Sequence, residues 1–329
     1  MRRLDFALAA GVLLCAAAPA AWAPAWADDS SAALKAGGLV FTKQAHIRMA
    51  REDLYISPTR VKVRYAFVND GKTDVDTIVA FPLPDIDVRE FYYEPLGTTL
   101  DASPNFMGFK LTVDGKPVEA TADARAVLDG KDVTDKVKAA GLPLNIVGTK
   151  LVDMLEKMPL AARKKFAAQG ILEMDGDDAH PHWIAKTSFW WHQKFPAGKT
   201  VVIGHEYQPV TGQFFFGEND LTAKEPGYAK YYCIDGGTQA AIRAKIRKLD
   251  PMGANGRYLQ GTQTEFVLKT ANNWKGGIGQ FRLTLDKLKP DNALSLCWDG
   301  ALKKTGATTF EAARDGFAPA RDVKLLVLQ

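Results

Sequence analysis

Polar and apolar residues alternate in several segments of the chain, and a period of two is typical of β-strands with one buried face. The clearest segment is 61–68, VKVRYAFV, which would direct Val61, Val63, Tyr65 and Phe67 to one side. Comparable segments occur at 38–41, 47–56, 75–81, 106–113, 187–195 and 200–207. The pattern therefore predicts a mainly β protein built from antiparallel strands.

Short turn sequences between these segments predict three β-hairpins. Their turns are Asn69-Asp70-Gly71, Asp114-Gly115 and Pro196-Ala197-Gly198. The third would join 187–195 to 200–207 in a long hairpin that is rich in aromatic residues.

The stretch 80–87, AFPLPDID, ends one of these strands with two prolines. Pro82 and Pro84 lack an N–H group, so this part of the chain cannot continue as a central strand. It would leave the sheet in a polyproline-like conformation. Asp85 and Asp87 would then lie on a solvated exit, without a partner that would make them a carboxylate pair. We interpret the stretch as architectural.

A helical period replaces the alternation between about residues 120 and 170. Asp132 would begin a helix that Gly141 ends, a second helix fits 150–157, and Pro159 suits the start of a third. One more helix at 239–249 precedes further strand-like segments. We expect an antiparallel β-sandwich at 28–215 with a helical insert at about 120–170, and a second, smaller β-rich part with one helix at 216–329.

The first 27 residues have the features of a Sec-type signal peptide. Arg2 and Arg3 precede an apolar run at 6–18, and Ala25-Trp26-Ala27 is a cleavage signal. Cleavage after Ala23 is an alternative, and an uncleaved anchor is another. The segment predicts a periplasmic or secreted protein with no transmembrane segment after cleavage.

Cleavage would leave two cysteines, Cys233 and Cys297. An even number in an oxidising compartment favours one disulfide, and two buried free thiols are the alternative. Each cysteine ends an apolar, strand-like run and is followed by an Asp-Gly pair. Two neighbouring strands joined at one end would have this pattern.

Several short sequence motifs resemble those of a family of exported bacterial proteins that is catalogued as a domain of unknown function. The motifs are GGLVFTK at 37–43, EDLYIS at 52–57 and FPLPD at 81–85. This resemblance covers essentially the whole mature chain, and it implies a periplasmic location without known catalytic residues. A weaker likeness at about 40–210 is to the vault and inter-alpha-trypsin-inhibitor type domain. It implies an antiparallel β-sandwich used for protein contacts, although the helical insert departs from that pattern.

One polar loop is a candidate metal site. Asp178, His180 and His182 follow further carboxylates, and two imidazoles in an extended H-x-H segment could hold Zn²⁺, Cu²⁺ or Ni²⁺. A surface loop with no metal is the alternative. His192 and His205, on the two arms of the aromatic hairpin, are a further possible pair, with partly buried structural histidines as the alternative.

The chain lacks the motifs of common catalytic sites. No G-x-S-x-G, H-E-x-x-H or P-loop sequence occurs. The formal net charge of +4 is too balanced to indicate a nucleic-acid partner. No cofactor is expected apart from a divalent metal, and the chain is more consistent with a binding protein than with an enzyme.

The aromatic residues are the candidate contact surface. Trp190 and Trp191 are neighbours on one strand, so they must point to opposite faces, and one of them would meet a second layer or a partner. Phe214 and Phe215 follow on the next strand. The leading hypothesis is a non-catalytic module that binds an envelope protein or a small ligand through the aromatic hairpin and the helical insert. The alternative is a metal-binding protein or metal-dependent enzyme that uses the 175–182 loop.

Overall fold

The structure is a computed structural model, and it describes residues 30–35, 38–89, 103–145, 149–224, 227–250 and 256–329. The predicted signal peptide at 1–27 lies outside the described residues. Within those residues, no helix has both the length and the apolar character needed to cross a membrane.

Two large sheets form a β-sandwich, as the alternating pattern predicts. Sheet I has the strand order β10-β9-β13-β5-β1-β2, with β6 also paired to β13. Its strands are β1 (Ser30–Lys35), β2 (Gly38–Thr42), β5 (Val75–Pro82), β6 (Ile86–Asp87), β9 (Thr121–Leu128), β10 (Lys131–Asp132) and β13 (Ile184–Phe195). Sheet II has the order β19-β20-β17-β3-β4-β14-β7-β8. Its strands are β3 (Ile47–Ser57), β4 (Arg60–Asn69), β7 (Lys110–Val113), β8 (Lys116–Val118), β14 (Thr200–Tyr207), β17 (Ile278–Asp286), β19 (Lys303–Lys304) and β20 (Thr309–Phe317).

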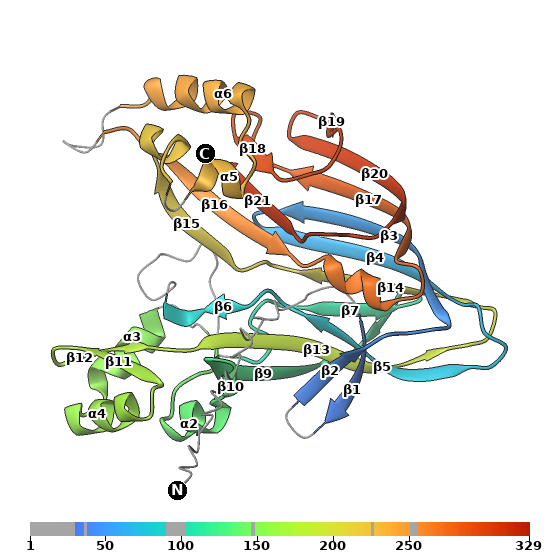
Figure 1. Ribbon diagram of the computed structural model, residues 1–329, viewed down its shortest axis with the longest axis horizontal. Coiled ribbons are helices and arrows are strands. Elements are labelled where there is room, and N and C mark those ends of the chain that lie inside the picture. Colours follow the sequence, from blue (N-terminus) through green and yellow to red (C-terminus); the bar gives the residue numbers. More distant parts are fainter. Residues whose placement is uncertain (1–29, 36–37, 90–102, 146–148, 225–226, 251–255) are drawn as a thin grey trace, which may run out of the picture.

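The core lies between the two sheets. Alternate residues of β4 and β13 are buried, as expected for strands with one solvated face. Aromatic rings meet across the gap: Phe81 of β5 and His205 of β14 have centroids 4.8 Å apart, and Phe67 and Phe195 have centroids 5.8 Å apart. In Figure 1, β3, β4, β17 and β20 lie above β9 and β13. The predicted fold class, mainly antiparallel β with a sandwich arrangement, is confirmed.

Two of the three expected hairpins are instead corners of the sandwich. β4 and β5 belong to different sheets, and so do β13 and β14. The buried side chain of Asn69 connects the two corners, because its Nδ2 donates to the carbonyl oxygens of Thr73 and Phe195 at 2.9 and 2.8 Å. Its Oδ1 accepts the N–H of Gly71 at 2.8 Å. These bonds replace the strand pairing that a hairpin would supply.

The remaining hairpin is present as predicted. β7 and β8 pair in antiparallel register, with Leu111 opposite Val118. The turn places Asp114 and Gly115 at φ angles of 49° and 77°. This left-handed conformation is typical of Asp-Gly turns.

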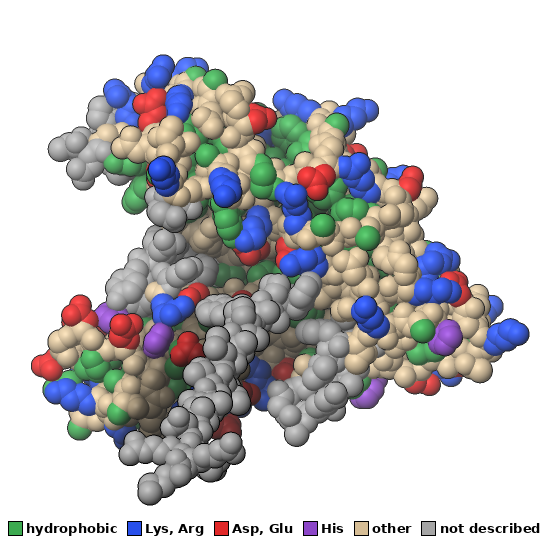
Figure 2. Space-filling view, in the orientation of Figure 1, with side chains coloured by type: hydrophobic (Ala, Val, Ile, Leu, Met, Phe, Trp, Pro, Cys, Tyr) green, Lys and Arg blue, Asp and Glu red, His purple; other side chains and the backbone are tan. Residues whose placement is uncertain are grey.

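The helical insert begins later than expected. Residues 121–132 form β9 and β10, and β9 pairs with β13 in sheet I because its alternating sequence ADARAV suits a strand. The helices are α2 (Thr134–Ala139), α3 (Thr149–Lys157) and α4 (Leu160–Ala168), and the hairpin of β11 (Leu172–Asp175) and β12 (Asp178–Pro181) follows them. Figure 2 shows the molecule hollowed between this insert and the part that carries the C-terminal helices.

The C-terminal part is joined to the sandwich by a shared sheet. β17 pairs in parallel with β3, and β20 pairs with β17, so the two expected parts, 28–215 and 216–329, both contribute strands to sheet II. Sheet III has the order β15-β16-β21-β18. Its strands are β15 (Thr211–Phe216), β16 (Leu259–Phe266), β18 (Ala293–Leu296) and β21 (Val323–Leu328), and a separate apolar cluster joins it to α5 (Tyr228–Tyr231) and α6 (Gly236–Arg247).

The disulfide between Cys233 and Cys297 is present, with Cα atoms 5.0 Å apart. Cys297 follows β18, but Cys233 lies between α5 and α6 and does not end a strand. Asp235 accepts the N–H of Thr238 at 2.7 Å, so its Asp-Gly sequence begins α6 instead of turning a hairpin. The bond therefore ties the helical layer to sheet III.

Candidate functional site

The outer face of sheet II is hollowed into an open pocket of about 830 Å³. Its residues come from β3, β4, β7, β14, β17, β19 and β20, and therefore from distant parts of the sequence. We call this surface the cationic face. Its charged members are Asp53, Lys62, Arg64, Lys110, Glu206, Arg282, Lys303 and Glu311.

Strand register arranges the face in two rows that run across the sheet. The first row follows the pairs Thr112–Gly204, Gly204–Arg64, Arg64–Asp53, Asp53–Arg282 and Arg282–Ala313. The second row runs from Lys110 through Glu206, Lys62, Tyr55, Thr284 and Glu311 to Lys303. Because side chains alternate along each strand, the polar residues of these rows point outward while their neighbours fill the core.

Nearby cations neutralise two of the three carboxylates on this face. Arg51 donates two hydrogen bonds to Asp53, at 2.7 and 2.8 Å. Glu206 accepts hydrogen bonds from Arg60 and lies 3.4 Å from Lys62. The hydrogen bond from Arg60, followed by that from Lys62, lowers the pKa of Glu206 from its usual value. Both carboxylates are therefore already paired.

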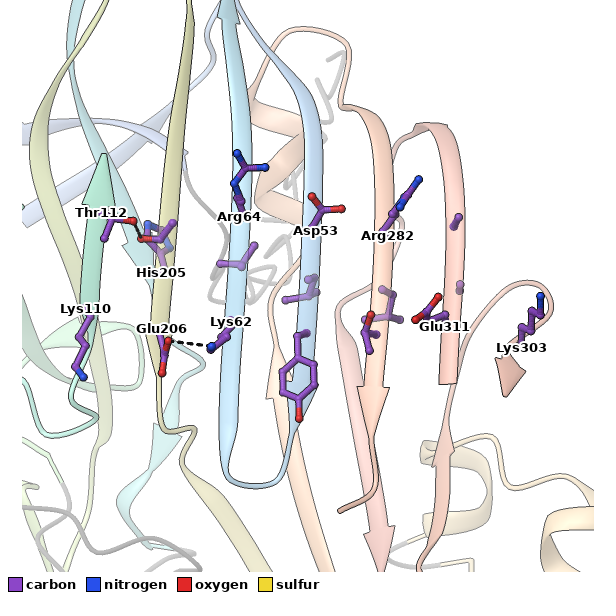
Figure 3. A pocket seen from close by; sticks show the side chains of 18 of the residues that line it. Asp53, Lys62, Arg64, Lys110, Thr112, His205, Glu206, Arg282, Lys303 and Glu311 are labelled. Carbon is purple, nitrogen blue, oxygen red and sulfur yellow. Dashed lines mark hydrogen bonds and ion pairs between the residues drawn. The ribbon is translucent and has the colours of Figure 1, made fainter. Parts of the chain in front are cut away.

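Arg64 and Arg282 stand on either side of Asp53, on the strands that flank β3 (Figure 3). Both are exposed, and neither has an ion pair or a hydrogen bond from its side chain to any residue that the structure describes. Lys110 and Lys303 are also exposed at the two ends of the second row. Five cations and three carboxylates line the pocket, so its charge favours an anion.

Small residues give the row its depth. Gly204 lies beside Arg64, and a Cβ atom at this position would come within 2.7 Å of Thr112 Oγ1. Ala313 stands on the other side of Arg282. The two guanidinium groups therefore project beside short side chains and remain accessible.

His205 lies beneath this face, in the core. The rings of Tyr65, Phe81, Phe109 and Trp191 surround it at centroid distances of 4.8 to 5.6 Å. Burial lowers its pKa to about 3, so the imidazole is neutral at physiological pH. The hypothesis of a pair with His192 is wrong, because His192 is exposed on β13 and the two strands belong to different sheets.

The candidate metal residues lie on the hairpin of β11 and β12. Asp178 and His180 have the extended backbone that the H-x-H pattern required, and His180 pairs with Glu173 across the hairpin. Among the described residues, no group of three His, Cys, Asp or Glu side chains is arranged to hold a metal ion. The metal site stays a prediction, which metal analysis of the purified protein and of an H180A/H182A variant would test.

The four candidate aromatic residues do not share one surface. Trp191 is buried in the sandwich core, while Trp190 is half-buried on the outer side of sheet I, with its ring 5.8 Å from that of His192. Phe214 stacks on Tyr228 with centroids 4.6 Å apart. Phe215 is 66% exposed, and it lies on sheet III. The four aromatic residues proposed as a contact surface are therefore divided between sheets I and III.

Sequence reasoning missed the cationic face. The alternation in 61–68 places Lys62 and Arg64 on the solvated side of their strand, so half of the signal was present. Nothing local showed that Arg282 would lie two strands away, because β17 joins β3 in parallel from the other end of the chain.

A model of a protein family matches residues 27–326, which is nearly the whole chain. The family is described as a domain of unknown function, DUF4424. The chain belongs to this family. The predicted resemblance to a family of unknown function is thereby confirmed. No curated protein matches the chain.

Solved structures with a similar chain path have low identity. A Legionella pneumophila protein with the provisional name of nutrient binding protein is 15% identical, with a TM-score of 0.47, and the match covers 92% of this chain and 71% of that one. An M1 zinc metallopeptidase from Deinococcus radiodurans, solved as a mutant with a bound peptide substrate, is 7% identical, with a TM-score of 0.29. That match covers 88% of this chain and 44% of the peptidase.

Proposed function

We propose that this DUF4424 protein is an exported, non-catalytic binding module that holds an anionic ligand on the cationic face of sheet II. The observation that carries the proposal is the position of Arg64 and Arg282 on either side of Asp53. Asp53 is already paired with Arg51 through two hydrogen bonds. The guanidinium groups of Arg64 and Arg282 are therefore available to pair with a ligand.

The spacing of the two arginines bears on the size of the ligand. Their strands are separated by β3 alone, and neighbouring strands lie about 4.8 Å apart, so their backbones are roughly 10 Å apart. Guanidinium groups bind carboxylates and phosphates through paired hydrogen bonds. A ligand with two acidic groups, or one acidic group held from both sides, fits this arrangement.

The chemistry of the face supports binding rather than catalysis. Its cations are arginine and lysine side chains, and two of its three carboxylates are already paired with cations. The imidazole nearest to the face, that of His205, is enclosed by aromatic rings on the inner side of the sheet. The disulfide is consistent with an oxidising compartment, where an exported binding protein would work.

Calorimetric titration with glutarate, citrate and inorganic phosphate at low ionic strength tests the proposal. We expect at least one probe to bind, and to bind more weakly as salt is raised. R64Q and R282Q should each weaken that binding by about tenfold or more, as expected for the loss of a charged hydrogen-bond donor. K248Q, which removes an exposed charge at the C-cap of α6, outside the cationic face, is the control. Binding that is unchanged in R64Q and R282Q, or absent for every probe, contradicts the proposal.

A further inference from the structure

A second cavity, of about 250 Å³, lies where the sandwich meets sheet III. Several parts of the chain line it: the segment between β5 and β6, Met107 before β7, the segment that leads from β14 into β15, and residues of α5 and β16. Figure 1 shows β6 and β15 on facing sides of this junction. Ligand sites are frequent at such junctions between packed units.

The proline-rich stretch shapes one wall of the cavity. The N–H of Leu83 still donates to the carbonyl oxygen of Thr187 at 2.8 Å, and pairing with β13 resumes at Ile86. Pro84 and Asp85, between these points, leave the sheet and line the cavity together with Leu83 and Ile86. Asp85 is exposed, as the expected solvated exit requires, and Asp87 is half-buried. Both also line the cavity, and each is ion-paired, with Lys186 and Arg89 respectively.

The charged residues that line this cavity are all carboxylates. They are Asp85, Asp87 and Glu265, and no lysine or arginine is among the described lining residues. Their ion-pair partners, Lys186, Arg89 and Lys324, stand outside the lining.

Two carboxylate oxygens keep unused acceptor capacity. Asp85 is bound to Lys186 through Oδ2, and Glu265 receives Lys324 and the Tyr231 hydroxyl through Oε1. Asp85 Oδ1 and Glu265 Oε2 accept no hydrogen bond from the residues that the structure describes. Asp85 lies on the segment between β5 and β6 and Glu265 lies on β16, so the two carboxylates line the cavity from separate parts of the fold.

Apart from the amide of Gln263, which accepts the Tyr232 hydroxyl at 2.7 Å, the rest of the lining is apolar or aromatic. Met107, Tyr207, Pro209 and Val210 supply most of it, and the Tyr231 hydroxyl donates to Glu265 at 2.9 Å. Aromatic rings beside carboxylates suit a cation that carries an apolar stem, because the rings attract the charge and pack against the stem.

We propose that this cavity binds a ligand with a positively charged nitrogen on an apolar stem, such as the guanidinium of a basic side chain. Asp85 is exposed as a residue, but partial desolvation of its carboxyl raises the pKa of that group despite Lys186, and a bound cation would relieve this cost. A water molecule occupies about 30 Å³ of liquid, so the cavity has room for a group the size of one long side chain. This site differs from the cationic face in both its place and its charge, so either proposal can fail alone.

Calorimetric titration with N-acetyl-arginine amide and N-acetyl-citrulline amide tests the proposal, because the two probes have nearly the same shape and differ in charge. We expect the arginine probe to bind in the range of about 1 mM or tighter and the citrulline probe to bind about tenfold more weakly or worse. D85N and E265Q should each reduce binding of the arginine probe by about tenfold, while R64Q should leave it unchanged.

A variant that keeps both carboxylates separates loss of the site from loss of the fold. V210W would fill the cavity with a larger side chain, and it should abolish binding of the arginine probe if the cavity is the site. Circular dichroism and thermal melts check that each variant is folded. Equal binding of the two probes, no binding of the arginine probe at about 10 mM, or full binding in folded D85N, E265Q and V210W would overturn the proposal.

Discussion

The side-chain amide of Asn69 donates a 2.8 Å hydrogen bond to the carbonyl oxygen of Phe195, although the two residues are 126 positions apart. The same amide binds the backbone of Thr73 and Gly71, so one buried side chain holds both corners at this end of the sandwich. We predict that N69A lowers the free energy of unfolding by at least about 2 kcal/mol, because buried backbone groups lose their partners. Urea unfolding measures this.

The control for this prediction is Asn105, an exposed residue that makes two hydrogen bonds to the backbone of Phe109. N105A should cost clearly less, since water can replace its bonds. Equal losses for N69A and N105A would contradict the special role of the buried corner.

His205 should make the protein sensitive to acid. The pKa of His205 in the folded protein, about 3, is below the ordinary value of 6.5. Between these two pH values, the imidazole binds a proton in the unfolded chain but not in the folded protein. Stability from this group is therefore complete above about pH 6.5 and falls as the pH drops toward 3, by up to roughly 1.4 kcal/mol per pH unit. H205F should flatten this part of the stability curve between pH 7 and pH 4, as urea unfolding at each pH would show.

The exposed His192 supplies the comparison. H192Q should leave the slope of stability against pH as it is in the unchanged protein. An identical slope in H205F would show that carboxylates, and not this imidazole, govern the acid response.

The disulfide should contribute substantially to the stability of the C-terminal part. Cys233 and Cys297 close a loop with a sequence separation of 64, for which the loop-entropy relation gives about 4 kcal/mol. We expect reductant to lower the melting temperature and to increase hydrogen exchange in α5 and α6, which the bond ties to sheet III. The C233A/C297A variant should melt at the lower temperature, and reductant should not change it further. A reductant effect of the same size in that variant would contradict the prediction, because the effect could not then come from the Cys233–Cys297 bond.

Thr112 on β7 should make glycine necessary at position 204. An alanine Cβ would meet Thr112 Oγ1 at 2.7 Å, and Thr112 would have to turn away from its 3.3 Å hydrogen bond to the carbonyl oxygen of Gly204. We predict that G204A costs about 1 kcal/mol of stability and that T112A restores most of it in the double variant. Chemical unfolding of the four proteins in this cycle gives the coupling, and purely additive costs would contradict it.

Local sequence patterns predicted the strands well and their partners poorly. Val61, Val63, Tyr65 and Phe67 are all buried as the alternation requires, because that signal depends only on one strand and one core. The turn at Asn69 has the composition of a hairpin turn, but the chain crosses from one sheet to the other there. The crossing is held by the carbonyl of Phe195, a distant residue that the local sequence does not show.

The candidate site shows the same limit. Trp190 and Trp191 are conspicuous in the sequence, but Trp191 is a core residue, and both belong to sheet I, whereas the cationic face is on sheet II. Arg64 and Arg282 are inconspicuous in the sequence, and they gain meaning from the strand register that places Asp53 between them.

The parallel pairing of β3 with β17 also sets an order of events. Arg64 and Asp53 belong to strands that are made early, whereas Arg282 arrives with the last quarter of the sequence. A chain released before β17 would therefore carry half of the arginine pair, beside an open edge on β3. The cationic face therefore forms only after β17 has paired with β3.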